Sequence, residues 1–372
     1  MKKVKLGEVA TFINGYAFKP QDWSTEGKEI IRIQNLTKTS KEINYYSGKI
    51  DKKYIVETGD ILISWSGTLG VFQWYGKTAV LNQHIFKAVF DKLDINKSYF
   101  KYVVEKGLQD AVKNTHGSTM KHLTKKYFDN IIVSYTSLKE QQKISRKLDL
   151  LSKLISMRQE QLEELNLLVK SRFNEMFEEY PDSVFLDTYI KELRAGKSLA
   201  GEENNKNKVL KTGAVSYDYF NSSEVKNLPI DYIPLDEHKV EIGDVIISRM
   251  NTSELVGAAG YVWAINSDNI YLPDRLWKVI LNDRVNPVFL WKLITNEKTK
   301  LKIKRISSGT SGSMKNISKS KFLQIRVPLP PLSLQNEFAD FVAQVDKSQL
   351  AIQKSLEELE TLKKSLMQEY FG

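Results

Sequence analysis

Two polar loops contain the residues best suited to bind another molecule. The first reads THGSTMKHLT (Thr115–Thr124) and the second SSGTSGSMKNIS (Ser307–Ser318), so both carry Gly-Ser, Met-Lys and a closing Leu/Ile-Ser/Thr pair. Short polar side chains beside glycine can enter a groove and hydrogen-bond to base edges, and a lysine can contact a phosphate. Neither loop contains a recognised catalytic signature. The chemistry that this pattern favours is therefore recognition rather than bond making.

The composition favours a polyanionic partner and argues against metal or redox chemistry. The 372 residues include 55 Lys+Arg and 45 Asp+Glu, a net charge of +10, which surrounds the protein with a positive field. Charge alone leaves open a basic protein whose lysines only solvate it. There is no cysteine and there are four histidines. Disulfides, thiolate catalysis and cysteine zinc sites are therefore excluded, and a metal centre has few ligands to draw on.

The length and hydropathy of the chain predict a two-domain cytoplasmic protein. No run of about 18 apolar residues occurs, and the opening MKKVKLGEVATFING is too polar after its lysines to be a signal peptide. A chain of 372 residues is long enough for two domains, each with its own core.

In the first half of the chain, the candidate contacts with a nucleic acid lie in three segments. Asn and Gln amides can pair with adenine at two points, and a histidine can bond a base or a phosphate. Two alternatives stay open: the Asn-Gln-His segment could satisfy the backbone of a strand end, and Trp65 could belong to the core. The candidates are Ser64, Trp65, Ser66 and Thr68, then Asn82, Gln83 and His84, and in the loop Thr115, His116, Ser118, Thr119, Lys121 and His122.

In the second half, arginines join the polar candidates. Arg249 and Arg275 are the best guanine readers, because a guanidinium can bond both major-groove acceptors at once; Arg275 could instead pair with Asp274 or another acid. The full set is Arg249, Asn251, Thr252, Arg275, Ser308, Thr310, Ser311, Ser313, Lys315 and Asn316. A nearby basic run could contact phosphates or could simply be a solvated helix face: Lys302, Lys304 and Arg305.

The two loops belong to an internal repeat that covers most of the chain. VETGDILISWSG (Val56–Gly67) matches VEIGDVIISRMN (Val240–Asn251), and both read as a turn that enters a buried strand. The Gly-Asp pair, with Asp60 and Asp244, is better explained by that turn than by a metal. From the loop Met to a closing Phe, the spacing is the same in both copies, whereas the fronts of the copies differ in length and residues. Each copy therefore has a divergent front and a constant back.

The back of each copy predicts a long helix with a narrow apolar seam. A heptad seam over about 40 residues requires a partner of equal length, which the other copy supplies, and an antiparallel pair would give pseudo-two-fold symmetry. Packing of each helix on its own domain is the alternative. The seams are Ile144, Leu148, Leu151, Ile155, Leu162, Leu165, Val169 and Met176, and Phe338, Val342, Val345, Ile352, Leu356, Leu359, Leu366 and Tyr370.

The fronts predict strand-rich globular regions, so the fold class is α+β. Short β-rich runs include EIIRIQNL (Glu29–Leu36) and DVIISR in the second copy, each bounded by turn residues. A front helix over residues 98–115 corresponds to a second helix over residues 287–306. The predicted domains are 1–136 and 180–330, and the helices are 137–179 and 331–372.

The Gly-Asp strand entry, the Met-Lys loop and the long helix occur in the same order in both copies. This duplicated arrangement resembles the DNA specificity subunit of Type I restriction-modification enzymes. The likeness runs from VKLGEVATFINGYAF (Val4–Phe18) through IRVPLPPLSLQ (Ile325–Gln335) to SLMQEYFG (Ser365–Gly372). The first copy departs from the pattern at IIVSYTSLKEQQ (Ile131–Gln142), which lacks the proline run.

The resemblance implies a non-catalytic subunit with two target recognition domains, each reading one half of a split, asymmetric DNA target. Two modification subunits would bind around the paired helices and methylate adenine with S-adenosylmethionine, and restriction subunits would join to cleave. This chain itself would need no cofactor. Tyr16 and Lys19 would border the DNA groove.

Two other functions compete with this interpretation. An enzyme, either a nuclease or a methyltransferase, is disfavoured because the chain has no NPPY or DPPY motif beside a glycine-rich loop and no GxxxxGK[S/T] phosphate loop. A scaffold that binds partner proteins through its helices is disfavoured by the duplicated loops and the basic charge. An orphan or phage-type specificity protein with altered partners would show the same sequence features and stays open as an alternative.

Overall fold

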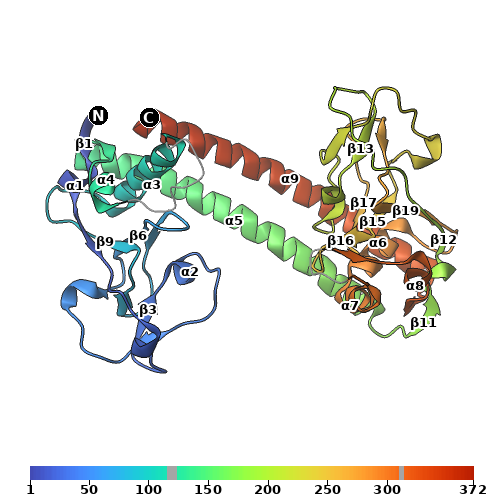
Figure 1. Cartoon of the computed structure of the whole chain (residues 1–372), viewed down its shortest axis with the longest axis horizontal. Coiled ribbons are helices and arrows are strands. Elements are labelled where there is room, and N and C mark those ends of the chain that lie inside the picture. Colours follow the sequence, from blue (N-terminus) through green and yellow to red (C-terminus); the bar gives the residue numbers. More distant parts are fainter. Residues whose placement is uncertain (115–123, 310–313) are drawn as a thin grey trace. The chain divides into compact units, whose positions relative to one another are not determined.

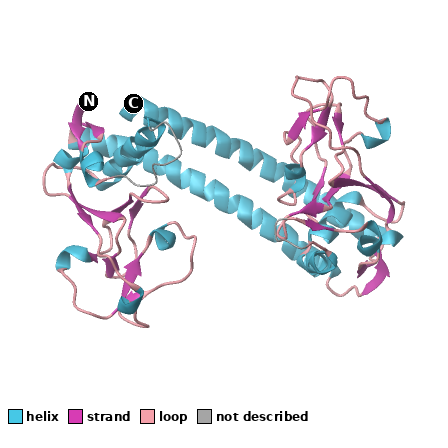
Figure 2. Cartoon of the chain, viewed as in Figure 1, coloured by secondary structure: helices cyan, strands magenta, loops and turns pink. Residues whose placement is uncertain are grey.

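The computed structural model describes residues 1–114, 124–309 and 314–372 of the chain. The chain forms two compact units, one made of Met1–Gln159 with Lys354–Gly372 and the other of Glu160–Gln353. Each unit combines a strand-rich region with parts of two long helices (Figures 1 and 2). The expected α+β fold class is therefore confirmed. Within these described ranges, no helix has the length and apolarity that crossing a membrane requires.

The described residues of the first unit form three small sheets. Their strand orders are β2-β9-β6-β7, β4-β3-β8-β5 and β1-β10. The strands are β1 (Lys2–Lys5), β2 (Thr11–Asn14), β3 (Lys28–Ile31), β4 (Tyr45–Tyr46), β5 (Ile55–Val56), β6 (Ile61–Ser64), β7 (Gly70–Gln73), β8 (Ala79–Leu81), β9 (Ile85–Val89) and β10 (Ile132–Tyr135). The helices are α1 (Leu6–Val9), α2 (Ile33–Leu36), α3 (Lys97–Asn114) and α4 (Lys125–Asp129), with 3-10 turns η1 (Pro20–Asp22) and η2 (Lys52–Tyr54).

The second unit repeats this plan. Its sheets have the orders β12-β19-β15-β17, β14-β13-β18, β11-β21 and β16-β20. The strands are β11 (Asp182–Phe185), β12 (Ile190–Arg194), β13 (Lys208–Leu210), β14 (Val225–Asn227), β15 (Val245–Ser248), β16 (Met250–Asn251), β17 (Ala259–Tyr261), β18 (Ile270–Tyr271), β19 (Leu276–Leu281), β20 (Lys315–Asn316) and β21 (Arg326–Pro328). The helices are α6 (Pro287–Thr295), α7 (Glu297–Ile306) and α8 (Lys319–Leu323), with 3-10 turns η3 (Leu186–Thr188), η4 (Thr212–Val215) and η5 (Asp236–His238).

The repeated Gly-Asp pair forms a turn, as the sequence predicts. Gly59 and Gly243 have φ angles of 90° and 96°, which glycine adopts without steric cost. The carboxylate of Asp60 accepts a hydrogen bond from the backbone N–H of Glu57, and Asp244 accepts one from Glu241. Both aspartates therefore use their carboxylates to close the turn that leads into β6 or β15.

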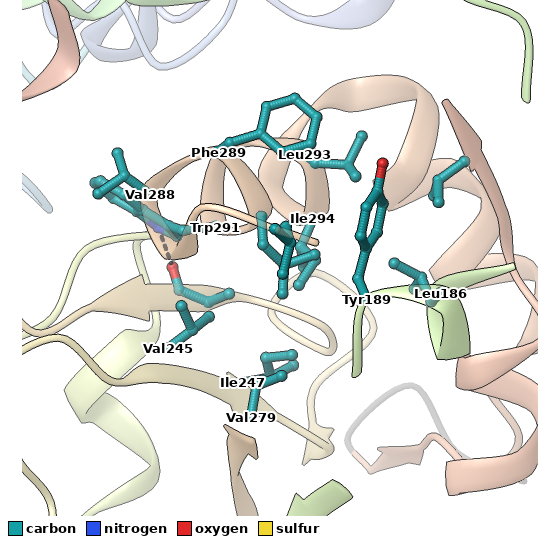
Figure 3. Packing of buried hydrophobic residues seen from close by; sticks show 14 of the residues in the cluster. Leu186, Tyr189, Val245, Ile247, Val279, Val288, Phe289, Trp291, Leu293 and Ile294 are labelled. Atoms are coloured by element: carbon teal, nitrogen blue, oxygen red, sulfur yellow. Dashed lines mark hydrogen bonds between the residues drawn. The ribbon is translucent and has the colours of Figure 1, made fainter. Parts of the chain in front are cut away.

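The buried strand after each turn is the centre of its unit. Every residue of β6 and of β15 is buried. Figure 3 shows Val245 and Ile247 of β15 below Ile294 of α6, and these residues belong to one buried cluster. The indole N–H of Trp291 also donates to the carbonyl of Ala259 at 2.9 Å. The Trp291 side chain therefore packs in the apolar core and also provides a hydrogen bond to a buried backbone carbonyl.

Two long helices, α5 (Leu138–Phe177) and α9 (Leu332–Phe371), contribute to the core of each unit. In the second unit the ring of Phe338 lies 5.4 Å from the rings of both Phe173 and Phe177. The beginning of α9 therefore packs against the end of α5 there. This contact confirms antiparallel pairing of the two helices.

The first unit makes the same contact with the helices exchanged. Ile144 and Leu148, near the beginning of α5, share one core with Met367 and Phe371 at the end of α9. In the repeat these four residues correspond to Phe338, Val342, Phe173 and Phe177. The predicted seam residues are all at least partly buried, but the sequence analysis omitted the four residues that close the helix ends: Phe173, Phe177, Met367 and Phe371.

A buried glutamine joins each long helix to the strand-rich region of its unit. Gln141 and Gln335 are both fully buried. The Gln335 side chain accepts a hydrogen bond from the backbone N–H of Asn286 at 3.0 Å and donates to the carbonyl of Pro330 at 3.0 Å. Gln141 accepts from the N–H of Asn96 at 2.8 Å in the same way. Each glutamine thus fixes the start of the front helix, α3 or α6, against the long helix.

Two local expectations were wrong. Residues 287–306 form two helices rather than one, because the chain turns at Asn296, whose side chain accepts a hydrogen bond from the N–H of Lys298 and begins α7. The predicted strand Glu29–Leu36 ends at Ile31, and Ile33–Leu36 form the short helix α2. In both places a side-chain hydrogen bond to the backbone overrides the residue pattern, since Asn35 similarly accepts from the N–H of Arg32.

Replacing the buried glutamine should loosen the second unit. Gln335→Ala leaves the Asn286 N–H and the Pro330 carbonyl without this partner, which should cost about 1–3 kcal/mol. Urea unfolding followed by circular dichroism should therefore show a lower midpoint. Gln344→Ala, on an exposed position of the same helix, is the matched control and should leave the midpoint unchanged. Equal midpoints for both variants would contradict a stabilising role of the Gln335 hydrogen bonds.

Candidate DNA interface

In the second unit, the described candidate residues lie on one connected surface. Strand β16 pairs with β20, which places Met250 opposite Asn316 and Asn251 opposite Lys315. The N–H of Arg249 donates to the carbonyl of Arg275 at 3.0 Å, so a third segment joins the same place. Ser308 also bridges to Asn316. Backbone hydrogen bonds therefore gather these residues: Arg249, Asn251, Thr252, Arg275, Ser308, Lys315 and Asn316.

The two arginines of this surface have different surroundings. The guanidinium carbon of Arg249 lies 5.7 Å from the ring centre of Trp277, and its buried Nε has no hydrogen-bond partner within the described part of the chain. Arg275 is exposed and makes no ion pair with any described residue. Asp274, the alternative partner of Arg275, instead accepts a hydrogen bond from the hydroxyl of Ser198. Both guanidinium groups therefore keep donors for another molecule.

The smaller polar side chains of this surface partly support one another. The amide of Asn251 donates to the hydroxyl of Ser248 at 3.3 Å, and its oxygen accepts from the N–H of Thr252 at 2.9 Å. The ammonium of Lys315 donates to the carbonyl of Gly309 at 2.8 Å. These bonds hold the side chains in place, but they leave Lys315 with further donors, because an ammonium has three.

The first unit gathers its described candidates in the same way. Tyr16 forms a bridge with Asn82, and the N–H of Gln83 donates to the carbonyl of Tyr16 at 2.8 Å. The N–H of Trp65 donates to the carbonyl of His84 at 3.2 Å. Three described segments, around Tyr16, Trp65 and residues 82–84, therefore meet beside the end of β6, much as segments of the second unit meet beside the end of β15.

Trp65 is partly buried against the core and also lies at the candidate surface, the two positions that the sequence left open. Its ring stacks on Phe86 with centroids 5.6 Å apart and packs partly buried against the core. Its indole N–H donates to the side-chain oxygen of Asn14 at 3.0 Å. The residue covers the core with one face and remains half-buried at the candidate surface.

Two of the candidate serines do not face solvent. Ser64 is fully buried and its hydroxyl donates to the carbonyl of Thr68 at 2.6 Å, while Ser66 is 7% exposed. They therefore shape the turn after β6 and are too buried to present their hydroxyl groups to another molecule. Thr68, Tyr16 and Lys19 are exposed.

Part of the predicted basic run is already paired within the unit. Lys302 contacts the carboxylate of Asp182 and donates to the carbonyl of Arg326 at 2.8 Å. Lys304 lies 3.4 Å from the carboxylate of Glu254. Of the three residues in this run, only Arg305 makes no ion pair with a described residue. The two lysines therefore form ion pairs within the unit, which neither of the two sequence interpretations predicted.

Nine candidates fall outside the described residues, in the two loops with which the sequence pattern began. They are Thr115, His116, Ser118, Thr119, Lys121 and His122 in the first unit and Thr310, Ser311 and Ser313 in the second.

The structure reveals a correspondence that the sequence analysis missed. LNQHIF (Leu81–Phe86) and LPDRLW (Leu272–Trp277) occupy the same place, because Trp65 and Arg249 donate the same backbone bond to His84 and Arg275. Thus Trp65 with His84 in one unit corresponds to Arg249 with Arg275 in the other. The matching register of the two hexapeptides was the available signal, and it is weak because few of their residues are identical.

The chemistry of the surface is that of binding. Within residues 1–114, 124–309 and 314–372, no group of three or more His, Cys, Asp or Glu side chains could hold a metal ion. The side chains that remain available are hydrogen-bond donors and cations, which suit a nucleic acid.

The comparisons with known proteins identify the family of the chain. The family model described as Type I restriction modification DNA specificity domain matches residues 1–167 and 190–362. The chain therefore belongs to this family, a class defined by DNA recognition and not by catalysis. The resemblance drawn from the sequence is confirmed.

Individual relatives are distant. The specificity subunit of the type I restriction enzyme EcoBI from Escherichia coli is 29% identical over 170 residues, 45% of this chain and 36% of the relative. The MjaVIII specificity subunit from Methanocaldococcus jannaschii is 25% identical over 340 residues, 85% of this chain and 79% of the relative. The match to EcoBI thus spans about a third of that relative's length.

Two solved structures share the fold. A type I restriction-modification S subunit from M. genitalium has a TM-score of 0.60 at 15% identity, covering 100% of this chain and 96% of that one. A chain from a study of complex assembly and conformational transition in the type I R-M system has a TM-score of 0.53 at 16% identity, covering 99% and 97%.

Truncating Trp65 and Arg249, which occupy corresponding positions, should show which of them stabilises its unit. Trp65→Ala removes a ring packed on Phe86 and should cost about 2–3 kcal/mol of unfolding free energy. Arg249→Ala removes a stacked cation with no internal hydrogen bond from its Nε, so it should cost less than about 1 kcal/mol. Urea unfolding of the full chain measures both. If the two losses were equal, Arg249 would have to be regarded as a structural residue.

Proposed function

We propose that this chain reads a split, asymmetric DNA target, one half with each unit. The observation that supports this most directly is the correspondence of the two surfaces. The same backbone hydrogen bond presents Trp65 and His84 in one unit but Arg249 and Arg275 in the other. The two units thus share one backbone arrangement but present different side chains, which suits two half-targets of different sequence.

The side chains suggest what each half contains. In the second unit, Arg249 and Arg275 would each bond guanine at its two major-groove acceptors, for which a good bidentate contact contributes about 1–3 kcal/mol of discrimination. Trp277 supports this role for Arg249, because stacking restricts the plane of the guanidinium. In the first unit, Asn82 and Gln83 would read adenine.

The proposal includes partners and a cofactor that this chain does not contain. Two modification subunits would bind around the paired helices α5 and α9 and methylate adenine with S-adenosylmethionine, and restriction subunits would join them to cleave DNA. The chain would supply the choice of sequence and would need no cofactor of its own. We place this activity in the cytoplasm, as expected from the sequence. Because both units are on one chain, binding of one half would raise the effective concentration of the other.

Methylation sequencing tests the proposal. A host without adenine methylation would express the chain together with the modification subunit encoded beside it, and a control would express the modification subunit alone. We expect a split, asymmetric motif that appears only when the chain is present. An active modification subunit with no chain-dependent motif would instead favour a scaffold role.

Corresponding substitutions should alter opposite halves of the motif. Arg275→Gln should relax at least one guanine position in one half, with a loss of discrimination of about 1–3 kcal/mol, and should leave the other half unchanged. His84→Asn is the matched change in the first unit. Asparagine is chosen because His84 has a φ of 72°, which asparagine tolerates better than most residues. The same sequencing measures both variants, and a change of the same half by both would contradict the assignment of one half to each unit.

A further inference from the structure

A basic groove lies between α7 and α8 of the second unit. It has a volume of about 540 Å³ and is lined by Lys302, Arg305, Ile306, Lys321, Gln324, Ile325 and Arg326. None of these described lining residues is acidic. We call this surface the α7–α8 groove.

Most of the positive charge in the groove is available to another molecule. Arg305, Lys321 and Arg326 are exposed and make no ion pair with the described residues. Arg326 lies over the ring of Phe185 at 5.1 Å, which orients the guanidinium and leaves its hydrogen-bond donors uncommitted. Lys302 is the exception, because its ammonium contacts Asp182.

The groove is joined directly to the candidate base-reading surface. Helix α7 ends at Ile306, two residues before Ser308, and α8 begins three residues after Asn316. Buried Ile303 and Phe322 anchor the two helices in the core that also contains Trp277, which lies under Arg249. The helices that carry the groove cations and the segments that carry the candidate base readers are therefore continuous in the chain and rest on the same core.

The corresponding positions of the first unit lack these cations. In the repeat, Tyr127 takes the place of Lys321 and Ile132 takes the place of Arg326. Both are exposed, at 40% and 55%, so the difference is not one of burial. The basic groove is thus a property of the second unit at these positions.

We propose that the α7–α8 groove binds the phosphodiester backbone of DNA next to the half-target read by the second unit. Arginine and lysine that face a backbone fix the register of a protein on the duplex without reading sequence. The groove combines three cations that make no ion pair with a described residue and no acidic lining residue, and this charge favours a polyanion over a protein surface. This inference rests on the proposed function and adds an asymmetry to it: the second unit would hold DNA more tightly and with a steeper dependence on salt.

The test is the salt dependence of DNA binding. The full chain, in complex with its modification subunit, would be titrated against a labelled duplex that contains the methylated motif, at several salt concentrations. Arg305→Gln with Lys321→Gln should lower the slope of log K against log salt by about 1.8, since each phosphate contact contributes about 0.9. Binding at 0.15 M salt should weaken roughly ten- to fiftyfold, while the methylated motif stays the same.

The matched control removes the same charge outside the groove. Lys191→Gln with Lys206→Gln changes two exposed lysines of the same unit that make no ion pair with a described residue, and it should leave the slope as in the wild type. An unchanged slope for the groove variant would overturn the inference. So would a normal slope combined with weaker binding of the modification subunit, which would assign the groove to a protein partner. Failure of the proposed function is a different result, namely the absence of any split motif with the wild-type chain.

Discussion

The structure depends on one repeated contact, in which the beginning of one long helix and the end of the other are buried together in the core of a strand-rich region. Phe338 with Phe173 and Phe177 forms this contact in the second unit, and Ile144 and Leu148 with Met367 and Phe371 form it in the first. A helix of 40 residues exposes too much apolar surface to be stable alone, and the strand-rich region covers part of it. Since each unit needs both helices, neither copy of the repeat can complete a unit by itself.

The buried glutamines give this contact its precision. Apolar packing does not by itself fix the rotation of one helix against another, whereas Gln141 and Gln335 each bond a defined backbone group at the start of a front helix. A slip of that helix would leave a buried amide unsatisfied, at a cost of about 1–3 kcal/mol. The front helices α3 and α6 are therefore held in a fixed position against the long helices. Because the candidate recognition surface packs on the same core, its position is fixed as well.

The same frame presents different chemistry in the two units. Trp65 and Arg249 follow corresponding buried strands, and each rests on an aromatic side chain, Phe86 or Trp277. Exchanging a residue at this place changes what faces the partner without disturbing the strand below it. This separation of frame from contact residues explains how the fronts of the two copies could diverge while their backs kept one length. In the proposed function, the α7–α8 groove would extend this difference from the base-reading residues to contacts with the DNA backbone.

The sequence by itself determined the repeat, the two long helices, the Gly-Asp turns and the family, because each leaves a local pattern of period, spacing or turn residues. It could not determine which candidates face solvent. Ser64 looked available but is buried, and Lys302 looked available but contacts Asp182, 120 residues away. The signal in the sequence that His84 corresponds to Arg275 was also weak, since a backbone hydrogen bond from a segment distant in the chain defines that position. Only the tertiary structure decided these points, because burial and pairing depend on residues that approach each other through the fold rather than along the chain.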